Sequence, residues 1–146
     1  MENMTGRLKL HFDVPGDDYT RAGEASAQVK QTLRKLGLQP GIIRRTSIAM
    51  YEGEINMVIH AEGGEIDFEI DSAYIYITLR DTGHGIDDVE LAMKEGYSTA
   101  SEKVRSMGFG AGMGLPNMKK HSDYMNIESI PGAGTTVFIK IAIGGE

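Results

Sequence analysis

The sequence predicts an α+β fold, a two-layer sandwich with helices on one face of a mixed, mostly antiparallel sheet. The first observation is the order of the expected elements: strand, two helices, two strands, short helix, loop, helix, two strands. The second is a tight turn between neighbouring strands, at Asp71-Ser72 and again at Pro131-Gly132. Short turns of this kind join antiparallel strands, and hairpins mixed with helices favour a sandwich.

The first half of the chain switches between the periods of strands and helices. The elements expected there are a strand over Leu8 to Val14, a helix from Asp17 or Asp18 to about Leu36, a helix from about Ile42 to Ala61, and strands over Ile66 to Ile70 and Tyr74 to Arg80. An aspartate is a good N-cap, and glycines end both helices, at Gly37 and at Gly63-Gly64.

The second half contains a long polar stretch between regular elements. The elements expected there are a short helix around Val89 to Lys94, a mobile loop from Glu95 to Gly112, a helix from Leu115 to about Ser122, and strands over Met125 to Ile130 and Thr135 to Ile143. Pro116 is acceptable in the last helix because proline is tolerated in a first turn.

Composition excludes several classes of protein. The 146 residues fit one domain over 1–146, and the net charge of −6 argues against binding nucleic acid through a basic surface. There is no cysteine, so disulfides and thiolate metal sites are excluded. The start is polar, and no apolar run approaches the roughly 20 residues that cross a bilayer, so we expect a cytoplasmic protein without membrane contact.

Three polar residues recur at intervals of four along the second helix, at Glu52, Asn56 and His60. This spacing places them in one line, about 6 Å apart per step. One interpretation is a solvated helix edge. The other is a site for a metal and a phosphate, in which Asn56 offers its carbonyl oxygen to Mg²⁺ and Glu52 accepts a proton.

Glycine is the unusual residue, with 19 copies gathered largely into short clusters. Asp81-Thr-Gly83-His-Gly85 follows a strand, where the glycines let the chain turn back and the carboxylate face a pocket. There it could accept a hydrogen bond from an exocyclic amine such as that of adenine. An ordinary Asp-Gly turn explains the same residues.

A second cluster, Gly108-Phe-Gly110-Ala-Gly112-Met-Gly114-Leu115, runs into a helix. Alternating glycines expose backbone N–H groups, and the helix N-terminus adds partial positive charge, which together suit a phosphate. A flexible hinge is the alternative. The run lacks the ending of a P-loop. A third cluster, Gly132-Ala-Gly134-Thr135-Thr136, taken alone is a hairpin turn.

In this order, the four elements resemble the N, G1, G2 and G3 boxes of the GHKL ATPases, over about Met50 to Val137. The resemblance implies the Bergerat fold, with ATP and Mg²⁺ held between the helices and a mobile lid. The chain's size, the run around Tyr97 to Thr99, and Gly-Met-Gly-Leu-Pro116 resemble the single-domain anti-sigma-factor and switch-type serine kinases in particular.

The resemblance implies a role for each matched residue. Asn56 is the Mg²⁺ ligand, Asp81 reads adenine, and Thr136 (or Thr135) supports Asp81. Glu52 is the general base, and Arg105 reaches the γ-phosphate. The remaining nucleotide-binding residues implied are His60, Gly83, Gly85, Gly108, Gly110, Gly112, Gly114 and Leu115.

Two functions follow from the resemblance. The first is a serine/threonine kinase acting on a small regulatory partner, an anti-sigma antagonist-like protein or scaffold domain. The second is a non-catalytic module in which ATP binding changes the affinity for a partner such as a sigma factor or phosphatase. The two differ at Glu52 and Arg105. ATP hydrolysis that drives a conformational cycle is disfavoured, because we expect no second domain that it could move. The chain is expected to be a monomer or homodimer.

Overall fold

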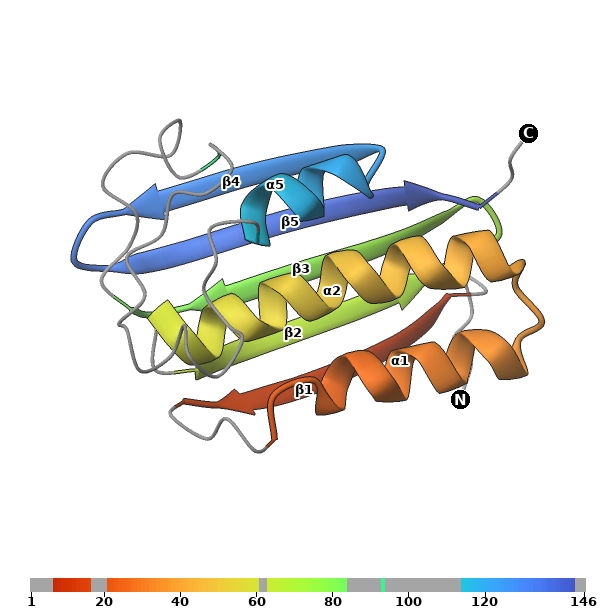
Figure 1. The fold of residues 1–146 in the computed structure, drawn as a ribbon, viewed down its shortest axis with the longest axis horizontal. Helices are drawn as coiled ribbons and strands as arrows, with labels where there is room; N and C mark the ends of the chain where they lie inside the picture. Colours follow the sequence, from red (N-terminus) through yellow and green to blue (C-terminus); the bar gives the residue numbers. More distant parts are fainter. Residues whose placement is uncertain (1–6, 17–20, 61–62, 84–92, 94–113, 144–146) are drawn as a thin grey trace.

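The computed structural model describes residues 7–16, 21–60, 63–83, 93 and 114–143, and for Ile59 and His60 it describes the backbone alone. The elements are β1 (Leu8–Pro15), α1 (Glu24–Lys35), α2 (Pro40–His60), β2 (Gly63–Ile70), β3 (Tyr74–Asp81), α5 (Gly114–Lys120), β4 (Tyr124–Ile130) and β5 (Gly134–Ala142). Their order and bounds agree with the sequence prediction to within a few residues, except at the start of α1 (Figure 1).

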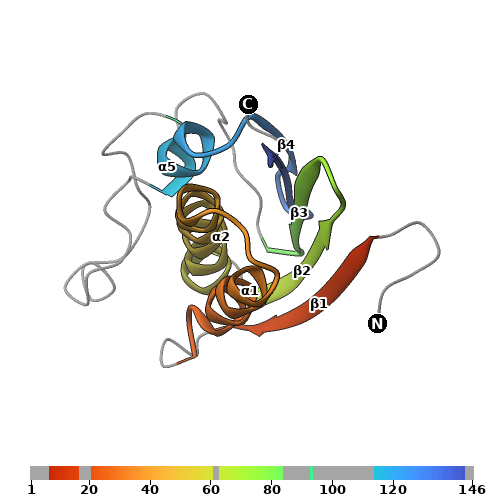
Figure 2. The ribbon, with the colours of Figure 1, turned by 90° about the vertical axis from the view of Figure 1, so that its right-hand side faces the viewer.

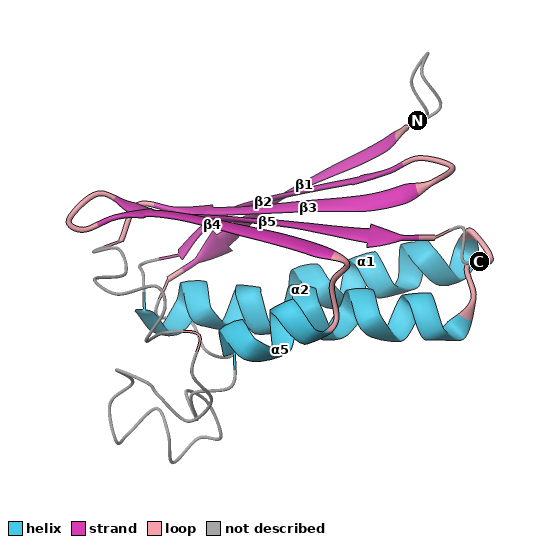
Figure 3. Cartoon of the chain, turned by 90° about the horizontal axis from the view of Figure 1, so that it is seen from above, coloured by secondary structure: helices cyan, strands magenta, loops and turns pink. Residues whose placement is uncertain are grey.

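The strands form one five-stranded sheet in the order β1-β2-β3-β5-β4. The four described strand pairings are all antiparallel. The expectation of a mixed sheet was therefore wrong for the described strands. The helices α1, α2 and α5 all lie on one side of it, which Figures 2 and 3 show edge-on. This confirms the predicted α+β architecture of two layers.

The core lies between the inner sheet face and the helices. Burial alternates along most of each strand, and inward-facing residues of the central strands are fully buried, as at Ile66, Ile77 and Ile139. Val29 and Met50 meet them from α1 and α2. Because side chains alternate along a strand, the intervening residues lie on the open face of the sheet.

The helix α1 begins later than predicted. The expected start at Asp17 or Asp18 lies outside the described residues, and the backbone bends and turns before the helix begins at Glu24. The preceding residue, Gly23, has φ +98°, a left-handed conformation that a helix cannot continue through. The cap is not a local aspartate, because the first amides of α1 are bound by Glu54 of α2.

The two long helices are separated by a compact connection. Gly37, with φ +79°, follows α1, and its amide donates to the Arg34 carbonyl oxygen at 3.0 Å. Leu38 N donates to Leu33 O at 3.2 Å, the paired bonds of a glycine-ended helix. Pro40 then opens α2, as proline favours a first turn.

Among the described residues, no helix combines the length and apolarity that crossing a membrane requires.

Candidate functional site

Four predicted elements converge at one end of the molecule. The C-terminal half of α2, the end of β3, the start of β5 and the start of α5 lie toward the same end in Figure 1. Glu52 and Asn56 are half-buried on α2, one turn apart. His60 is the last residue of that helix, and its side chain is outside the described part.

Asn56 touches the end of the glycine run. A Cβ added to Gly114 would lie 2.8 Å from Asn56 Nδ2 and 3.0 Å from Oδ1, closer than real Cβ contacts. The absence of a side chain at Gly114 therefore lets the first residue of α5 approach the Asn56 amide. The structure brings together the predicted metal ligand and the last glycine of the predicted phosphate loop. The next residue, Leu115, is buried in the core.

Glu52 contacts the same helix one turn further on. Asn117 Nδ2 donates to Glu52 Oε2 at 3.4 Å. Sequence reasoning did not select Asn117. Its spacing of three from Gly114 was the available signal, because i and i+3 share a helix face. Both residues of α5 consequently meet α2.

Asp81 ends β3 and is held by two backbone amides. Its Oδ1 accepts hydrogen bonds from Gly83 N at 2.9 Å and from Thr135 N at 3.3 Å. Asp81 is the cross-strand partner of Thr135, so the aspartate predicted to bind adenine and the start of β5 lie side by side. The first amide also closes a turn at Gly83, as the Asp-Gly pattern indicated.

Of the two threonines considered, Thr135 is the one beside Asp81. Thr135 is 8% exposed on the helix side of the sheet, and its hydroxyl lies 2.9 Å from Ser129 Oγ. Thr136 pairs with Arg80 on the open face. The first choice, Thr136, therefore lies on the face of β5 opposite to Thr135, and its role toward Asp81 stays a prediction.

Several predicted residues cannot be placed. The short helix around Val89 to Lys94 and the loop from Glu95 to Gly112 fall almost wholly outside the described residues. So do five candidate site residues, namely Gly85, Arg105, Gly108, Gly110 and Gly112. Their roles stay predictions.

Glu54 and Gly53, both inside α2, have structural roles. Glu54 is 2% exposed and accepts hydrogen bonds from Gly23, Ala25 and Ser26, so it binds the start of α1. A Cβ at Gly53 would lie 2.6 Å from Leu79 Cδ2, which shows close packing of α2 on the sheet. Burial raises the pKa of the Tyr51 phenol, and the charges of the neighbouring glutamates raise it further.

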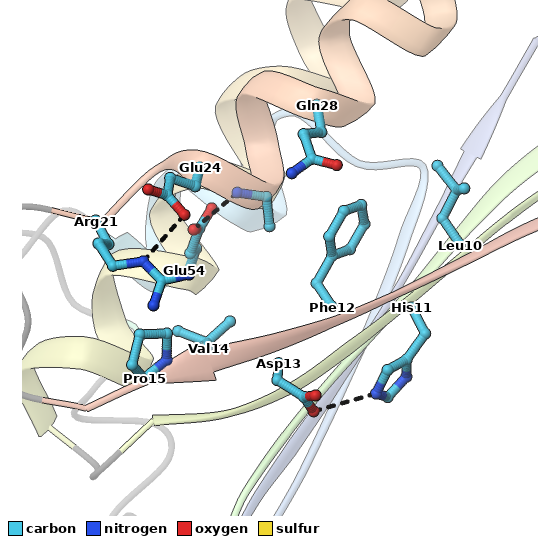
Figure 4. Close-up of a pocket in the computed structure, with 11 residues that line it drawn as sticks. Leu10, His11, Phe12, Asp13, Val14, Pro15, Arg21, Glu24, Gln28 and Glu54 are labelled. Carbon is cyan, nitrogen blue, oxygen red and sulfur yellow. Dashed lines mark hydrogen bonds and ion pairs between the residues drawn. The ribbon is translucent and has the colours of Figure 1, made fainter.

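Two other features lie outside the predicted nucleotide site. A cavity of about 320 Å³ lies between β1 and α1, lined among others by Phe12, Gln28 and Glu54 (Figure 4). On the open sheet face, His11, Asp13 and Glu65 place ligand-type atoms within 4.8 Å of one another. Neither feature includes Glu52, Asn56 or Asp81.

The described residues fit a nucleotide and a divalent cation. An asparagine carbonyl oxygen is a suitable Mg²⁺ ligand, and Asn56 is half-exposed beside Gly114. Asp81 is a carboxylate in a fixed orientation beside a strand end. Such a group can accept a hydrogen bond from an adenine amine.

Comparison with known proteins gives the class. The family described as histidine kinase-, DNA gyrase B- and HSP90-like ATPase matches residues 41–144. The chain belongs to this family, and membership implies ATP binding.

Its particular relatives include anti-sigma F factors. The one from Halalkalibacterium halodurans is 36% identical over 145 residues, covering 94% of this chain and 92% of the relative. The one from Geobacillus stearothermophilus is 33% identical over 147 residues, covering 95% and 94%.

Solved structures show the same fold. One is the SiaB-SiaC complex from Pseudomonas aeruginosa, with a TM-score of 0.56 and 10% identity over 94% of this chain and 91% of the other. The RsbU and RsbW domains of Rv1364c from Mycobacterium tuberculosis give 0.57 and 16% identity, covering 92% of this chain and 32% of the other.

Proposed function

We propose that this chain is a serine/threonine protein kinase that transfers the γ-phosphoryl group of ATP to a small partner protein in a bacterial sigma-factor or stress-signalling switch. The partner is an anti-sigma antagonist-like protein or scaffold domain. The similarity to anti-sigma F factors, which spans nearly the whole chain, supports this class of partner. The similarity to the SiaB-SiaC complex supports the fold alone.

The observation that carries the proposal is the pairing of α2 with the start of α5. Asn56 and Glu52 lie one turn apart on α2, both half-exposed, and each meets α5 where it leaves the glycine run. One offers an amide oxygen and the other a carboxylate. A nucleotide phosphate held beside α5 is then within reach of a metal ligand and of a base.

The residues divide the reaction between them. The partner's hydroxyl oxygen bonds to the γ-phosphorus as the bond from that phosphorus to the bridging oxygen breaks, and ADP leaves with the electron pair. Glu52 accepts the hydroxyl proton. Asn56 would hold Mg²⁺, which would neutralise phosphate charge, and Asp81 with Thr135 would select adenine. Phosphoryl transfer needs little more than such alignment and charge neutralisation.

The remaining predicted residues complete this account. Arg105 brings a positive charge to the γ-phosphate. The glycines at 108, 110, 112 and 114 offer backbone N–H groups to the phosphates. His60 and Gly85 border the nucleotide.

The test uses γ-labelled ATP and Mg²⁺ in a lysate of the source organism, followed by mass spectrometry of phosphosites. Wild type is compared with Glu52→Ala and Asn56→Ala. The expected result is a small protein labelled on serine or threonine by the wild type, with labelling about 10²–10⁴-fold slower for Glu52→Ala. If the wild type binds ATP yet labels nothing, also with a purified antagonist-like protein supplied, the kinase proposal is wrong.

A second function is favoured by what the relatives are called. An anti-sigma factor is named for its effect on a sigma factor, so an ATP-gated binding module fits the same chain. In that case nucleotide changes affinity for the partner and no phosphate moves. Partner binding that depends on ATP, with Glu52→Ala equal to wild type, would favour the module.

A further inference from the structure

We propose that Asn117 is a positioning residue for Glu52, an inference that rests on the proposed kinase function. Its Nδ2 donates to Glu52 Oε2 at 3.4 Å, and both side chains are half-buried between α2 and α5. The bond is long, as hydrogen bonds of catalytic groups often are before substrate binds. One oxygen of the Glu52 carboxylate is thereby engaged, and the other is left to face a hydroxyl.

The helix that carries Asn117 is fixed on α2 at several points. Met118 packs where Gly53 has no side chain, and it is completely buried. Arg45 Nε donates to the His121 carbonyl oxygen at 3.2 Å, and Arg45 Nη2 pairs with Asp123 at 3.2 Å. The Asn117 amide therefore presents its N–H to Glu52 from a helix that contacts α2 through Met118 and through the residues just after its C-terminal end.

Asparagine suits this task better than a charged donor. A lysine at the same place would pair with the Glu52 carboxylate as a full charge and compete for the proton acceptor. The neutral amide restrains rotation of the carboxylate and leaves its charge available. Misplacing a reacting group by about 1 Å can cost on the order of 10²-fold in rate.

Asn117 also joins the base to the phosphate loop. Gly114 and Asn117 lie on the same face of α5, where the first approaches Asn56 and the second binds Glu52. A displacement of α5 would move both contacts together. We therefore assign Asn117 to the alignment of Glu52 relative to the nucleotide.

The first test is a double-mutant cycle on phosphoryl transfer, using wild type, Glu52→Ala, Asn117→Ala and the double variant. Asn117→Ala should lower kcat about tenfold and leave KM for ATP within about twofold, because the residue acts on the base and not on nucleotide binding. In the Glu52→Ala background the same change should have no further effect. Lys119→Ala, exposed on the same helix, is the control and should match wild type.

The second test does not depend on activity. The side-chain amide resonances of Asn117, recorded by ¹⁵N NMR without nucleotide, should shift when Glu52 is changed to Ala and stay unchanged with Lys119→Ala. The proposal would be overturned if the effects of the two substitutions on kcat were additive in free energy. It would also be overturned if the Asn117 amide resonances did not shift in Glu52→Ala. A wild type that transfers no phosphate overturns the kinase function and with it the catalytic meaning of the contact, while the NMR result still decides the contact itself.

Discussion

Glu54 of α2 binds the first turn of α1 through Ser26. Glu54 Oε1 accepts a hydrogen bond from the Ser26 hydroxyl at 2.7 Å and from the Ser26 amide at 3.0 Å. The other oxygen, Oε2, accepts from the amides of Gly23 at 3.0 Å and Ala25 at 3.1 Å. The carboxylate thus supplies, from a distant part of the chain, the cap that a helix N-terminus requires. It lies two residues from Glu52, so the helix with the proposed base is bound directly to α1.

Replacing Glu54 with Ala should be severely destabilising. The change leaves three buried or half-buried N–H groups and a hydroxyl without their acceptor, and we expect a loss of about 3 kcal/mol or more. Urea denaturation measures the free energy of unfolding. The control is Glu24→Ala, an exposed glutamate in the first turn of α1 that pairs with Arg21, which should lose under about 1 kcal/mol. Similar losses for both variants would contradict the assigned role.

Gly53 should tolerate no side chain, although it lies inside a helix. Alanine there would gain about 1 kcal/mol of helix propensity. Its Cβ, however, would meet Leu79 at 2.6 Å and Met118 at 2.9 Å, and overpacking costs about 1–3 kcal/mol. We expect Gly53→Ala to lower the melting temperature. Gly41→Ala, in the first turn of the same helix with nothing within 4 Å of the added Cβ, should leave it unchanged or raised. A stabilised Gly53→Ala would show that α2 does not pack as described.

Most of the fold could be predicted from the sequence because its signals are local. Alternation predicted the strands, and Gly37 predicted the end of α1. The start of α1 could not be predicted in this way. Its cap comes from Glu54, and only the fold brings that residue to the helix, so the local aspartates were a misleading signal.

In the candidate site, too, the residues marked by local sequence patterns could be predicted, and those that depend on tertiary contacts could not. Glu52, Asn56 and Asp81 were selected because spacing and neighbouring glycines mark them. Asn117 was missed because its partner lies on another helix. The choice between Thr135 and Thr136 depends on the register of β5 against β3, which local pattern leaves open.

His11 should make stability depend on pH in a defined direction. Its hydrogen bonds to Asp67 at 2.7 Å and Asp13 at 3.3 Å raise the pKa of the imidazole above its ordinary 6.5. A raised folded-state pKa gives a contribution that is complete below the unfolded value and is lost as pH rises through the folded value. The melting temperature of wild type should exceed that of His11→Gln most near pH 6, and the difference should shrink by about pH 9. A constant difference over this range would contradict the assigned ion pairs.

Gly114 should be required for nucleotide binding through its contact with Asn56. An alanine Cβ would lie 2.8 Å from the Asn56 amide and push it from its place. We expect Gly114→Ala to weaken ATP affinity about tenfold in isothermal titration calorimetry, with the melting temperature of the nucleotide-free protein little changed. Gly41→Ala, in the first turn of α2, is the matched control for affinity, since nothing lies within 4 Å of its added Cβ. Equal affinities for the two variants would argue against the contact.

In the proposed reaction two residues of α2 have different tasks: Asn56 serves nucleotide binding, and Glu52 serves phosphoryl transfer. The most direct measurement is the dissociation constant for ATP in the presence of Mg²⁺, determined for wild type, Asn56→Ala and Glu52→Ala. We expect at least about tenfold weaker ATP binding for Asn56→Ala and ATP binding within about twofold of wild type for Glu52→Ala. Undiminished ATP binding by Asn56→Ala would show that Asn56 does not hold the metal and its nucleotide.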